Sequence, residues 1–280
     1  MLSAVITAWN EEKDITHAFS SIKKLADEIV VVVDEATTDH TAEIAKKLGA
    51  KIFTHPHTGV VEPMRNFSIS KATGDWILLL DADEEIPASL AKKIRELIKD
   101  PSINYYRLPR KNIIFGKWIT SDHWWPDYVY RLFRRGSVTW KDAVHSVPIT
   151  RGEGKDLPAE EELSLVHHNY STVSEYLEQI DRYTQKAALP ASFTPSDLVT
   201  KPIGEFLSQY FARRGYTQGL HGVALAGLQM FSEFVRYLKL WQSQGFAEME
   251  FSQAQLTHEL KNKAREYRWW KSPKWIRRWL

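Results

Sequence analysis

The sequence predicts an α/β domain with a largely parallel sheet, followed by a helical region. Continuous apolar runs, too short for helices, recur along the first hundred residues and fit strands that are covered on both faces. Amphipathic segments with helical spacing separate these runs, and a β-α-β-α-β-α-β order implies parallel strands joined by right-handed crossovers. We therefore expect a sheet domain at residues 1–165, a helical region at 166–260 and a basic, tryptophan-rich tail at 261–280.

Each predicted element has a local signal. Strands are predicted at residues 2–8, 29–34, 51–54 and 76–81, and helices at residues 13–26, 40–48, 62–72 and 87–99. The first helix carries Ile15, Phe19 and Ile22 at the spacing of a buried stripe. The second helix stops before Gly49, because glycine readily adopts the left-handed backbone that ends a helix. The strand at 76–81 shows no polar alternation, so we expect both of its faces to be buried.

Two carboxylates, Asp81 and Asp83, follow this central strand directly. Side chains two residues apart point the same way in extended backbone, so the pair could form a weak oxygen site for Mg²⁺ or Mn²⁺ that substrate phosphates complete. A solvated acidic turn that caps the next helix is the alternative, and spacing alone leaves both open. Trp9 and Asp34 end the first two strands, and the carboxyl edge of an open α/β sheet is where ligands bind.

Several classes of protein are disfavoured. The chain has no Gly-x-Gly-x-x-Gly after the first strand and no Gly-x4-Gly-Lys-Ser/Thr, which argues against dinucleotide oxidoreductases and P-loop enzymes. Without cysteine there is neither a disulfide nor a thiolate metal site. Residues 1–6 lack the start of an export signal, and no apolar stretch reaches the roughly 18 residues that span a bilayer. We therefore expect a cytoplasmic protein without a membrane-spanning segment.

The second half of the chain changes character. Residues 103–149 are strand-like, and helices are expected at 172–188, 203–214 and 218–242, with a connection at 189–202. The last of these helices is apolar on more than one side, so we expect it to pack on several sides or to meet lipid. One stripe with a period of 3.6 residues contains Leu220, Val223, Ala224, Leu228, Phe231, Phe234, Val235, Leu238 and Trp241.

The tail at residues 261–280 holds eight Lys/Arg and one Glu, a charge of +7 within a total of +2, which leaves −5 for residues 1–260. Tryptophans interleave with the basic residues, as at a bilayer interface, and each Lys/Arg near anionic lipid contributes about 1 kcal/mol. We therefore expect peripheral attachment to an anionic surface, the inner face of the cytoplasmic membrane. The negative remainder argues against nucleic acid as a partner.

Three motifs, in order, resemble family 2 glycosyltransferases, which are inverting enzymes with the GT-A fold, a Rossmann-like nucleotide-diphospho-sugar transferase domain. They are Thr7-Ala8-Trp9-Asn10-Glu11-Glu12, Asp34-Glu35-Ala36-Thr37-Thr38-Asp39 and Asp81-Ala82-Asp83-Glu84. Residues 125–136, the pair Val144-His145 and residues 210–215 are similar to the lipopolysaccharide-core β-glucosyltransferase subgroup. The resemblance implies a UDP-sugar donor, Mg²⁺ or Mn²⁺, and an acceptor hydroxyl on a cell-envelope glycan or glycolipid.

The resemblance also implies roles for individual residues. The nucleotide-sugar-binding positions are Thr7, Trp9, Asn10, Glu11, Asp34, Arg65 and Asp81. Among these, Trp9 would stack on the base and Asp34 would bond its edge, while Asp83, with Asp81, would hold the metal. The sequence departs from the family pattern at Glu35 and Ala36, where smaller or more flexible residues are usual, and at Ser146, where an acidic residue is usual.

The sequence identifies the residues on the acceptor side of the site less clearly than those on the donor side. Asp127 is the candidate general base, with acceptor binding as its alternative role. Candidates for contact with the acceptor or with phosphate are Trp124, Trp125, Arg131 and His145. The aromatic residues fit a sugar platform or a half-buried sheet, and His145, His167 and His168 fit a structural role better than a metal ligand. The competing functions are a glycosyltransferase for polyprenyl phosphate and a non-catalytic nucleotide-sugar-binding protein.

Overall fold

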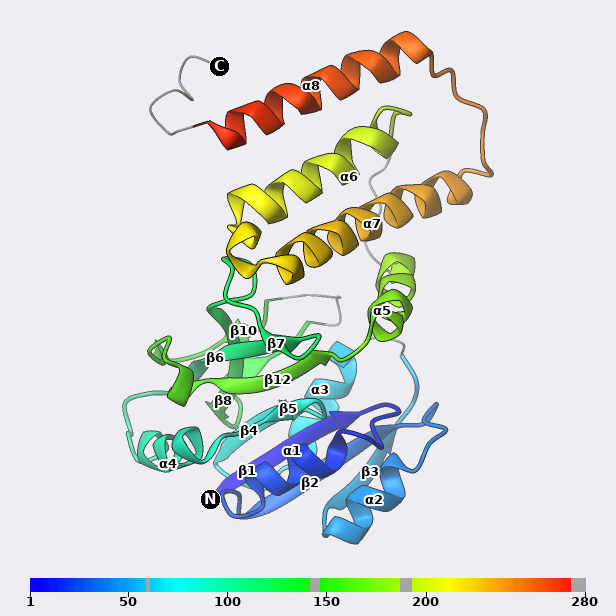
Figure 1. The fold of residues 1–280 in the computed structure, drawn as a ribbon. Helices are drawn as coiled ribbons and strands as arrows, with labels where there is room; N and C mark the ends of the chain where they lie inside the picture. Colours follow the sequence, from blue (N-terminus) through cyan, green and yellow to red (C-terminus); the bar gives the residue numbers. More distant parts are fainter. Residues whose placement is uncertain (59–60, 142–146, 187–192, 273–280) are drawn as a thin grey trace. The chain divides into compact units, whose positions relative to one another are not determined.

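The computed structural model describes residues 1–58, 61–141, 147–186 and 193–272 (Figure 1). The chain forms two compact units, which are described separately below. The first comprises Met1–Trp118 and Trp125–Asn169, and the second comprises Ile119–Trp124 and Tyr170–Leu280. The short segment Ile119–Trp124 thus belongs to the second unit, although both of its neighbours in sequence belong to the first.

A mixed sheet forms the first unit, and its strands run in the order β3-β2-β1-β4-β8-β6-β12-β5 (Figure 1). The predicted parallel part consists of β1 (Leu2–Ala8), β2 (Glu28–Asp34), β3 (Lys51–His55) and β4 (Trp76–Asp81). Antiparallel pairs extend it through β5 (Glu84–Glu85), β6 (Tyr105–Ile114), β8 (Asp127–Arg134) and β12 (Leu165–Tyr170). Short strands complete the unit: β7 (Lys117–Trp118), β9 (Val138–Thr139), β10 (Ile149–Thr150) and β11 (Gly154–Asp156).

Helices cover both faces of the parallel strands, which explains their unbroken apolar runs. These helices are α1 (Ile15–Ile22), α2 (Thr41–Leu48), α3 (Val61–Lys71) and α4 (Ala88–Leu97). In β1, Ala4 and Ile6 pack into a core cluster that also contains α1 and α4 residues, whereas Val5 packs into a second cluster with Met64 of α3. Because successive side chains point to opposite faces, both sets of strand residues are buried. The prediction of an α/β domain with buried parallel strands is confirmed.

A buried carboxylate ties the starts of these strands together. Glu28 accepts hydrogen bonds from the Ser3 hydroxyl, from the backbone and side chain of Thr73, and from Lys51 Nζ at 2.7 Å. Burial by itself raises the pKa of Glu28, but these bonds outweigh it and lower the pKa to about 2. The carboxylate is therefore charged in the folded protein and links β1, β2 and the turn before β4.

The second unit contains the helices predicted for the second half of the chain, whereas residues 166–170, expected in the helical region, belong to strand β12. Its helices are α5 (Val173–Lys186), α6 (Asp197–Leu207), α7 (Leu220–Ser243) and α8 (Gln253–Lys271). The prediction that residues 189–202 form a connection is wrong in part, because α6 begins at Asp197 and contains Pro202. Asp197 Oδ2 accepts hydrogen bonds from the backbone and hydroxyl of Thr194, which closes the turn before the helix, and Pro202 is buried. Burial of the proline ring therefore prevails over its tendency to break a helix.

The apolar stripe predicted on α7 lies largely at the surface. Leu220 is 82 % exposed and Phe231 44 % exposed, whereas Leu225 and Tyr237, outside that stripe, are buried. Helices α5 and α6 pack against α7, and its buried face includes the small residue Gly222. Gly222 leaves room for the backbone of Gly215, in the turn that precedes α7, because a Cβ there would lie 1.9 Å from the Gly215 carbonyl oxygen. Close fit on this side of the helix therefore accompanies burial of the less hydrophobic face.

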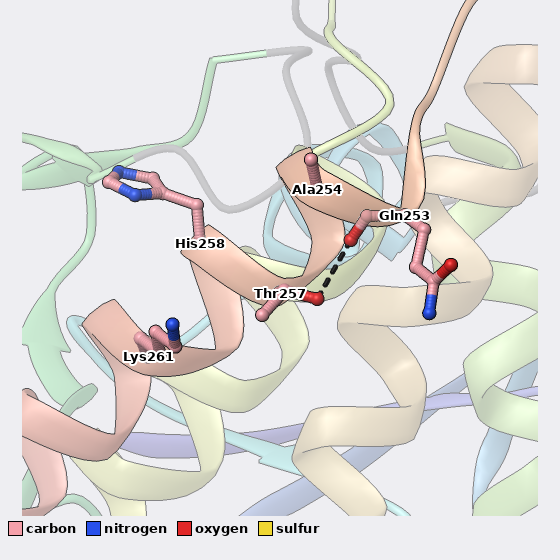
Figure 2. A pocket seen from close by; sticks show the side chains of 5 residues that line it. All are labelled: Gln253, Ala254, Thr257, His258 and Lys261. Atoms are coloured by element: carbon pink, nitrogen blue, oxygen red, sulfur yellow. Dashed lines mark hydrogen bonds between the residues drawn. The ribbon is translucent and has the colours of Figure 1, made fainter.

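A shallow hollow of about 530 Å³ runs along α8, lined by Gln253, Ala254, Thr257, His258 and Lys261 (Figure 2). The Thr257 hydroxyl donates to the Gln253 carbonyl at 2.8 Å within the same helix. The lining therefore shows one exposed helical face and no convergent set of catalytic groups. Within the described residues, no helix is both long enough and apolar enough to cross a bilayer.

Candidate functional site

The carboxyl ends of β1, β2 and β4 bring the predicted strand-end residues to one edge of the sheet. Thr7 lies opposite Asp81 across the β1–β4 pair and opposite Val32 across the β1–β2 pair. Asp34 ends β2 one residue beyond the last β1 partner. The parallel register is the reason, because it aligns the strand ends on the same side.

Asp34 lies close to an aromatic pair formed by Trp9 and His57. His57 Nδ1 is 3.0 Å from both carboxylate oxygens of Asp34, and its ring centroid is 5.3 Å from that of Trp9. The Ala36 amide donates to Asp34 Oδ1 at 2.8 Å, so this unusual position still supplies a backbone contact. The sequence prediction did not include His57, since no motif marks the loop after β3.

Asn10 and Glu11 organise the loops beside this pair. Asn10 has a φ of +57°, a left-handed conformation that asparagine tolerates better than most residues. Its Oδ1 accepts from the Thr38 amide at 2.8 Å, and the Glu11 amide donates to Thr41 Oγ1 at 2.8 Å. These bonds join the loop after β1 to the loop after β2.

A buried ionic cluster follows β4. Arg65 Nη2 is 3.0 Å from both oxygens of Asp81, and Arg131 Nη2 contacts Asp81 and lies 2.7 Å from Glu84 Oε1. The side chains of Arg131 and Glu84 are 3 % and 0 % exposed. The alternative of a solvated acidic turn is therefore wrong for Asp81 and Glu84.

The buried carboxylates and guanidinium groups of this cluster keep one another ionised. Burial raises the pKa of Asp81, but the positive charges of Arg131 and Arg65 outweigh it and keep the pKa well below its usual range. Burial lowers the pKa of Arg131, but Asp81 and Glu84 outweigh it and raise that pKa above its usual value. Arg131, predicted to contact phosphate or acceptor, thus has its guanidinium engaged by two carboxylates of its own chain.

A chain of polar contacts connects Asp83 to Asp127. Asp83 Oδ2 is 3.2 Å from His167 Nε2, and His167 Nδ1 is 2.6 Å from Asn112 Oδ1. Asn112 Nδ2 donates to Asp127 Oδ2 at 3.1 Å, and Arg110 Nε donates to the same oxygen at 2.8 Å. Arg110 also lies 3.3 Å from the buried Glu84, which joins this chain to the ionic cluster.

Asp127 is ionised in this setting. Burial raises its pKa, but the Arg110 charge and the hydrogen bonds from Asn112 and Arg110 lower it more, so the pKa lies below its usual range. Arg110 lies opposite Asp127 in the β6–β8 register, and Asn112 is two residues further along β6. The alternate spacing of two polar residues in that strand is a signal from which the sequence could have identified them.

Some residues present suit a divalent cation. In the described part of the chain, Asp83 Oδ1 is buried and has no hydrogen-bond partner, and His167 Nε2 lies beside the other oxygen. Asp81, the other predicted ligand, is instead paired with two arginines. Within the described residues, no three His, Cys, Asp or Glu side chains are grouped to hold a metal. Asp83 and His167 therefore fit a cation that takes its other ligands from substrate oxygens.

Trp124, Trp125 and His168 have local partners of their own. The Trp125 ring packs edge-on against Trp118 at 5.0 Å, whereas Trp124 belongs to the second unit and packs against His123. His168 Nε2 is 3.4 Å from Glu85, and His145 lies outside the described residues.

Among the residues that the structure describes, the buried side-chain atoms without a hydrogen-bond partner include four close to Asp81 in the strand pairing, the ion pairs or the sequence: Thr7 Oγ1, Arg65 Nε, Asp83 Oδ1 and Arg131 Nε. Buried polar atoms are nearly always hydrogen-bonded, so such atoms call for an explanation. Asp81 contacts both arginines, lies opposite Thr7 and precedes Asp83 by two residues. Their concentration around one strand end indicates a site for a polar ligand.

The chain is similar to several known proteins. An uncharacterized glycosyltransferase of Rickettsia typhi is 27 % identical over 261 residues, which cover 85 % of this chain and 86 % of the relative. A crystal structure of Staphylococcus aureus TarS residues 1–349 aligns over 90 % of this chain and 93 % of that one, with a TM-score of 0.46 and 16 % identity. Mycobacterium tuberculosis glucosyl-3-phosphoglycerate synthase with Mn²⁺, UDP-glucose and phosphoglyceric acid aligns over 40 % and 44 %, with a TM-score of 0.34 and 23 % identity.

The family assignment comes from a model of the whole family. The model described as glycosyl transferase family 2 matches residues 3–151, more than half of the chain. This range includes the three strand-end motifs and β8. The lipopolysaccharide-core subgroup remains a prediction. The chain belongs to glycosyltransferase family 2.

Proposed function

We propose that this protein is an inverting glycosyltransferase that moves a hexose such as glucose from a UDP-sugar to a hydroxyl of a cell-envelope glycan or glycolipid, such as lipopolysaccharide core. The observation that carries the proposal is the set of unpartnered buried atoms around Asp81, which includes two arginine nitrogens. Arginine nitrogens and a threonine hydroxyl suit the oxygens of a nucleoside diphosphate. Family membership supplies the reaction class.

The donor's base would lie at the Trp9 and Asp34 end of the site. Trp9 offers a ring for stacking, and the Asp34 carboxylate accepts from an N–H of the base edge. His57 contacts both residues. It would therefore lie next to the bound base, or the base would replace it as the hydrogen-bond partner of Asp34. The neighbouring Asn10 and Glu11 keep the loops around the base in place.

Asp83 and His167 would hold Mg²⁺ or Mn²⁺, and the cation would neutralise charge on the leaving diphosphate. Arg65 contributes positive charge at the same strand ends, where its Nε is available. Asp127 takes the proton of the acceptor hydroxyl as that oxygen attacks the anomeric carbon from the face opposite the diphosphate. Arg110 and Asn112 orient the Asp127 carboxylate and keep it ionised.

A thermal-shift screen of nucleotide sugars with Mn²⁺, followed by measurement of UDP release without acceptor, tests the proposal. We expect UDP-glucose or a related UDP-hexose to raise the melting temperature, and Asp83→Ala to abolish the Mn²⁺-dependent part. Asp156→Asn, which alters a half-exposed carboxylate paired with Arg107, is the matched control. Binding of a nucleotide sugar without any release of UDP would favour a non-catalytic binding protein. Sugar transfer to polyprenyl phosphate and to no glycan acceptor would favour a polyprenyl-phosphate glycosyltransferase.

We further propose that the basic tail attaches the enzyme to the anionic inner face of the cytoplasmic membrane, where glycolipid acceptors are found. The charge of +7 over residues 261–280 supports this, and the exposed apolar side of α7 offers additional contact area. Sedimentation with anionic liposomes compares the full chain with one ending at Lys261. We expect the shorter chain to bind weakly, and equal binding would contradict the proposal.

A further inference from the structure

Asn112 is completely buried between two groups of the proposed site, one on the acceptor side and one on the cation side. Its amide nitrogen faces Asp127 at 3.1 Å, and its amide oxygen faces His167 at 2.6 Å. A carboxylate only accepts hydrogen bonds, so the nitrogen of Asn112 must be the atom that faces Asp127. The ionised state of Asp127 therefore determines the orientation of the buried amide.

The orientation of the amide in turn determines the proton position on His167. An amide oxygen only accepts, so His167 must carry a proton on Nδ1. In the neutral ring Nε2 then presents its lone pair, and this atom lies 3.2 Å from Asp83 Oδ2. A carboxylate oxygen and an Nε2 lone pair at this distance repel each other unless a positive group lies beside them, either a second ring proton on Nε2 or a divalent cation.

We propose that Asn112 is a positioning residue that holds His167 in the Nδ1–H tautomer and so directs the Nε2 lone pair toward the cation of Asp83. This inference rests on the proposed function, because it assigns a role within the same site. It extends that function by making the cation affinity depend on a side chain that touches neither the cation nor the substrate. The acceptor-side carboxylate and the cation-side histidine are thereby coupled through one amide.

Variants at residue 112 separate this role from simple packing. Asn112→Leu removes both hydrogen bonds, whereas Asn112→Asp keeps an acceptor for His167 Nδ1. Asn104→Leu is the matched control, because Asn104 makes a structural bond to the Glu153 amide near the start of the same strand. The measurements are the long-range ¹⁵N–¹H spectrum of the histidine rings in the metal-free protein, with His167→Gln for assignment, and Mn²⁺ titration with and without UDP.

We expect an Nδ1–H tautomer for His167 in the wild type and in Asn112→Asp. Asn112→Leu should lose that preference and bind Mn²⁺ about 10–100-fold more weakly, the usual effect of removing a partner of a metal-bound histidine. The Asn104→Leu control should match the wild type in both measurements. Retention of Mn²⁺ affinity within threefold in a folded Asn112→Leu protein would overturn the proposal.

If Asn112→Leu does not fold, the wild-type spectrum still decides, because an Nε2–H tautomer at His167 contradicts the inference. The failure of the proposed function is distinguishable from this one. A protein that shows the expected tautomer and Mn²⁺ dependence but never releases UDP would contradict the proposed function alone. UDP release with an Mn²⁺ affinity insensitive to residue 112 would contradict only the role of Asn112.

Discussion

Replacement of Arg131 by methionine tests whether the buried ionic cluster is held by mutual neutralisation. The substitution removes the positive charge that contacts Asp81 and Glu84 while keeping an apolar side chain of similar length. Removing one partner of a buried ion pair typically costs about 3–5 kcal/mol, because an uncompensated charge remains buried. Asp81 retains Arg65 at 3.0 Å and Glu84 retains Arg110 at 3.3 Å, so we expect a value near the lower limit, about 3 kcal/mol.

Thermal and urea unfolding followed by circular dichroism measures this loss. A loss of about 3 kcal/mol corresponds to a fall in melting temperature of about 6–12 °C for a unit of this size. Because the chain has two compact units, hydrogen exchange in β4 and β8 attributes the change to the first. Arg135→Met on the exposed neighbouring turn is the control, and we expect it to stay within about 0.5 kcal/mol of the wild type.

A second substitution shows whether charge is the cause. Glu84→Gln in the Arg131→Met background removes one uncompensated carboxylate, so the double variant should recover about 1 kcal/mol or more relative to additivity. A loss below about 1 kcal/mol in Arg131→Met, or an effect no larger than that of Arg135→Met, would refute the reasoning.

Three further outcomes follow from particular contacts. Because folding lowers the pKa of Glu28 from 4.5 to about 2, its stabilisation is complete above pH 4.5 and is lost as the pH falls toward 2. Glu28→Gln should therefore lower the free energy of unfolding by on the order of 3 kcal/mol at neutral pH. Urea unfolding should also show a weaker dependence of that free energy on pH between 4.5 and 2, and an unchanged pH dependence would contradict this. In α7, a Cβ at Gly222 would lie 1.9 Å from a backbone oxygen, whereas one at Gly227 meets nothing within 4 Å. Gly222→Ala should thus cost about 1–3 kcal/mol while Gly227→Ala stabilises by about 0.4–1 kcal/mol, and the same melting temperature for both would count against the close approach. Asp127→Asn should keep UDP affinity and reduce turnover at least about a hundredfold, and normal turnover would remove it as the base.

Local patterns explain why so much of the parallel sheet was predictable. The run at 76–80 has no polar alternation, and all five of its residues are buried between two core clusters. The boundary of α6 was not predictable in the same way. Its start depends on a hydrogen bond between Asp197 and Thr194 and on burial of Pro202, and neither is visible in apolar spacing.

The choice of the buried face on α7 shows a different limit. From the sequence, the faces of a helix can be compared only by their hydrophobicity. That comparison predicts that the stripe with Leu220 and Phe231 is buried. In the structure the face with Gly222 and Leu225 is buried instead. Close packing depends on shape, and on this face the small residue Gly222 accommodates the backbone of the turn that precedes α7.

By itself the sequence determined the succession of the first strands and helices along the chain, the polar residues at the strand ends and the resemblance to a family, because these depend on local periodicity and on short motifs. Only the tertiary structure decided which contacts those residues make. Asp81 pairs with two arginines, and Asp83 contacts His167, which in turn contacts Asn112. His167 and Asn112 are 55 positions apart in sequence, and Arg131 and Glu84 are 47 apart. Contacts over such separations follow from the register between strands, which brings Arg110 opposite Asp127 and sets which buried charges meet.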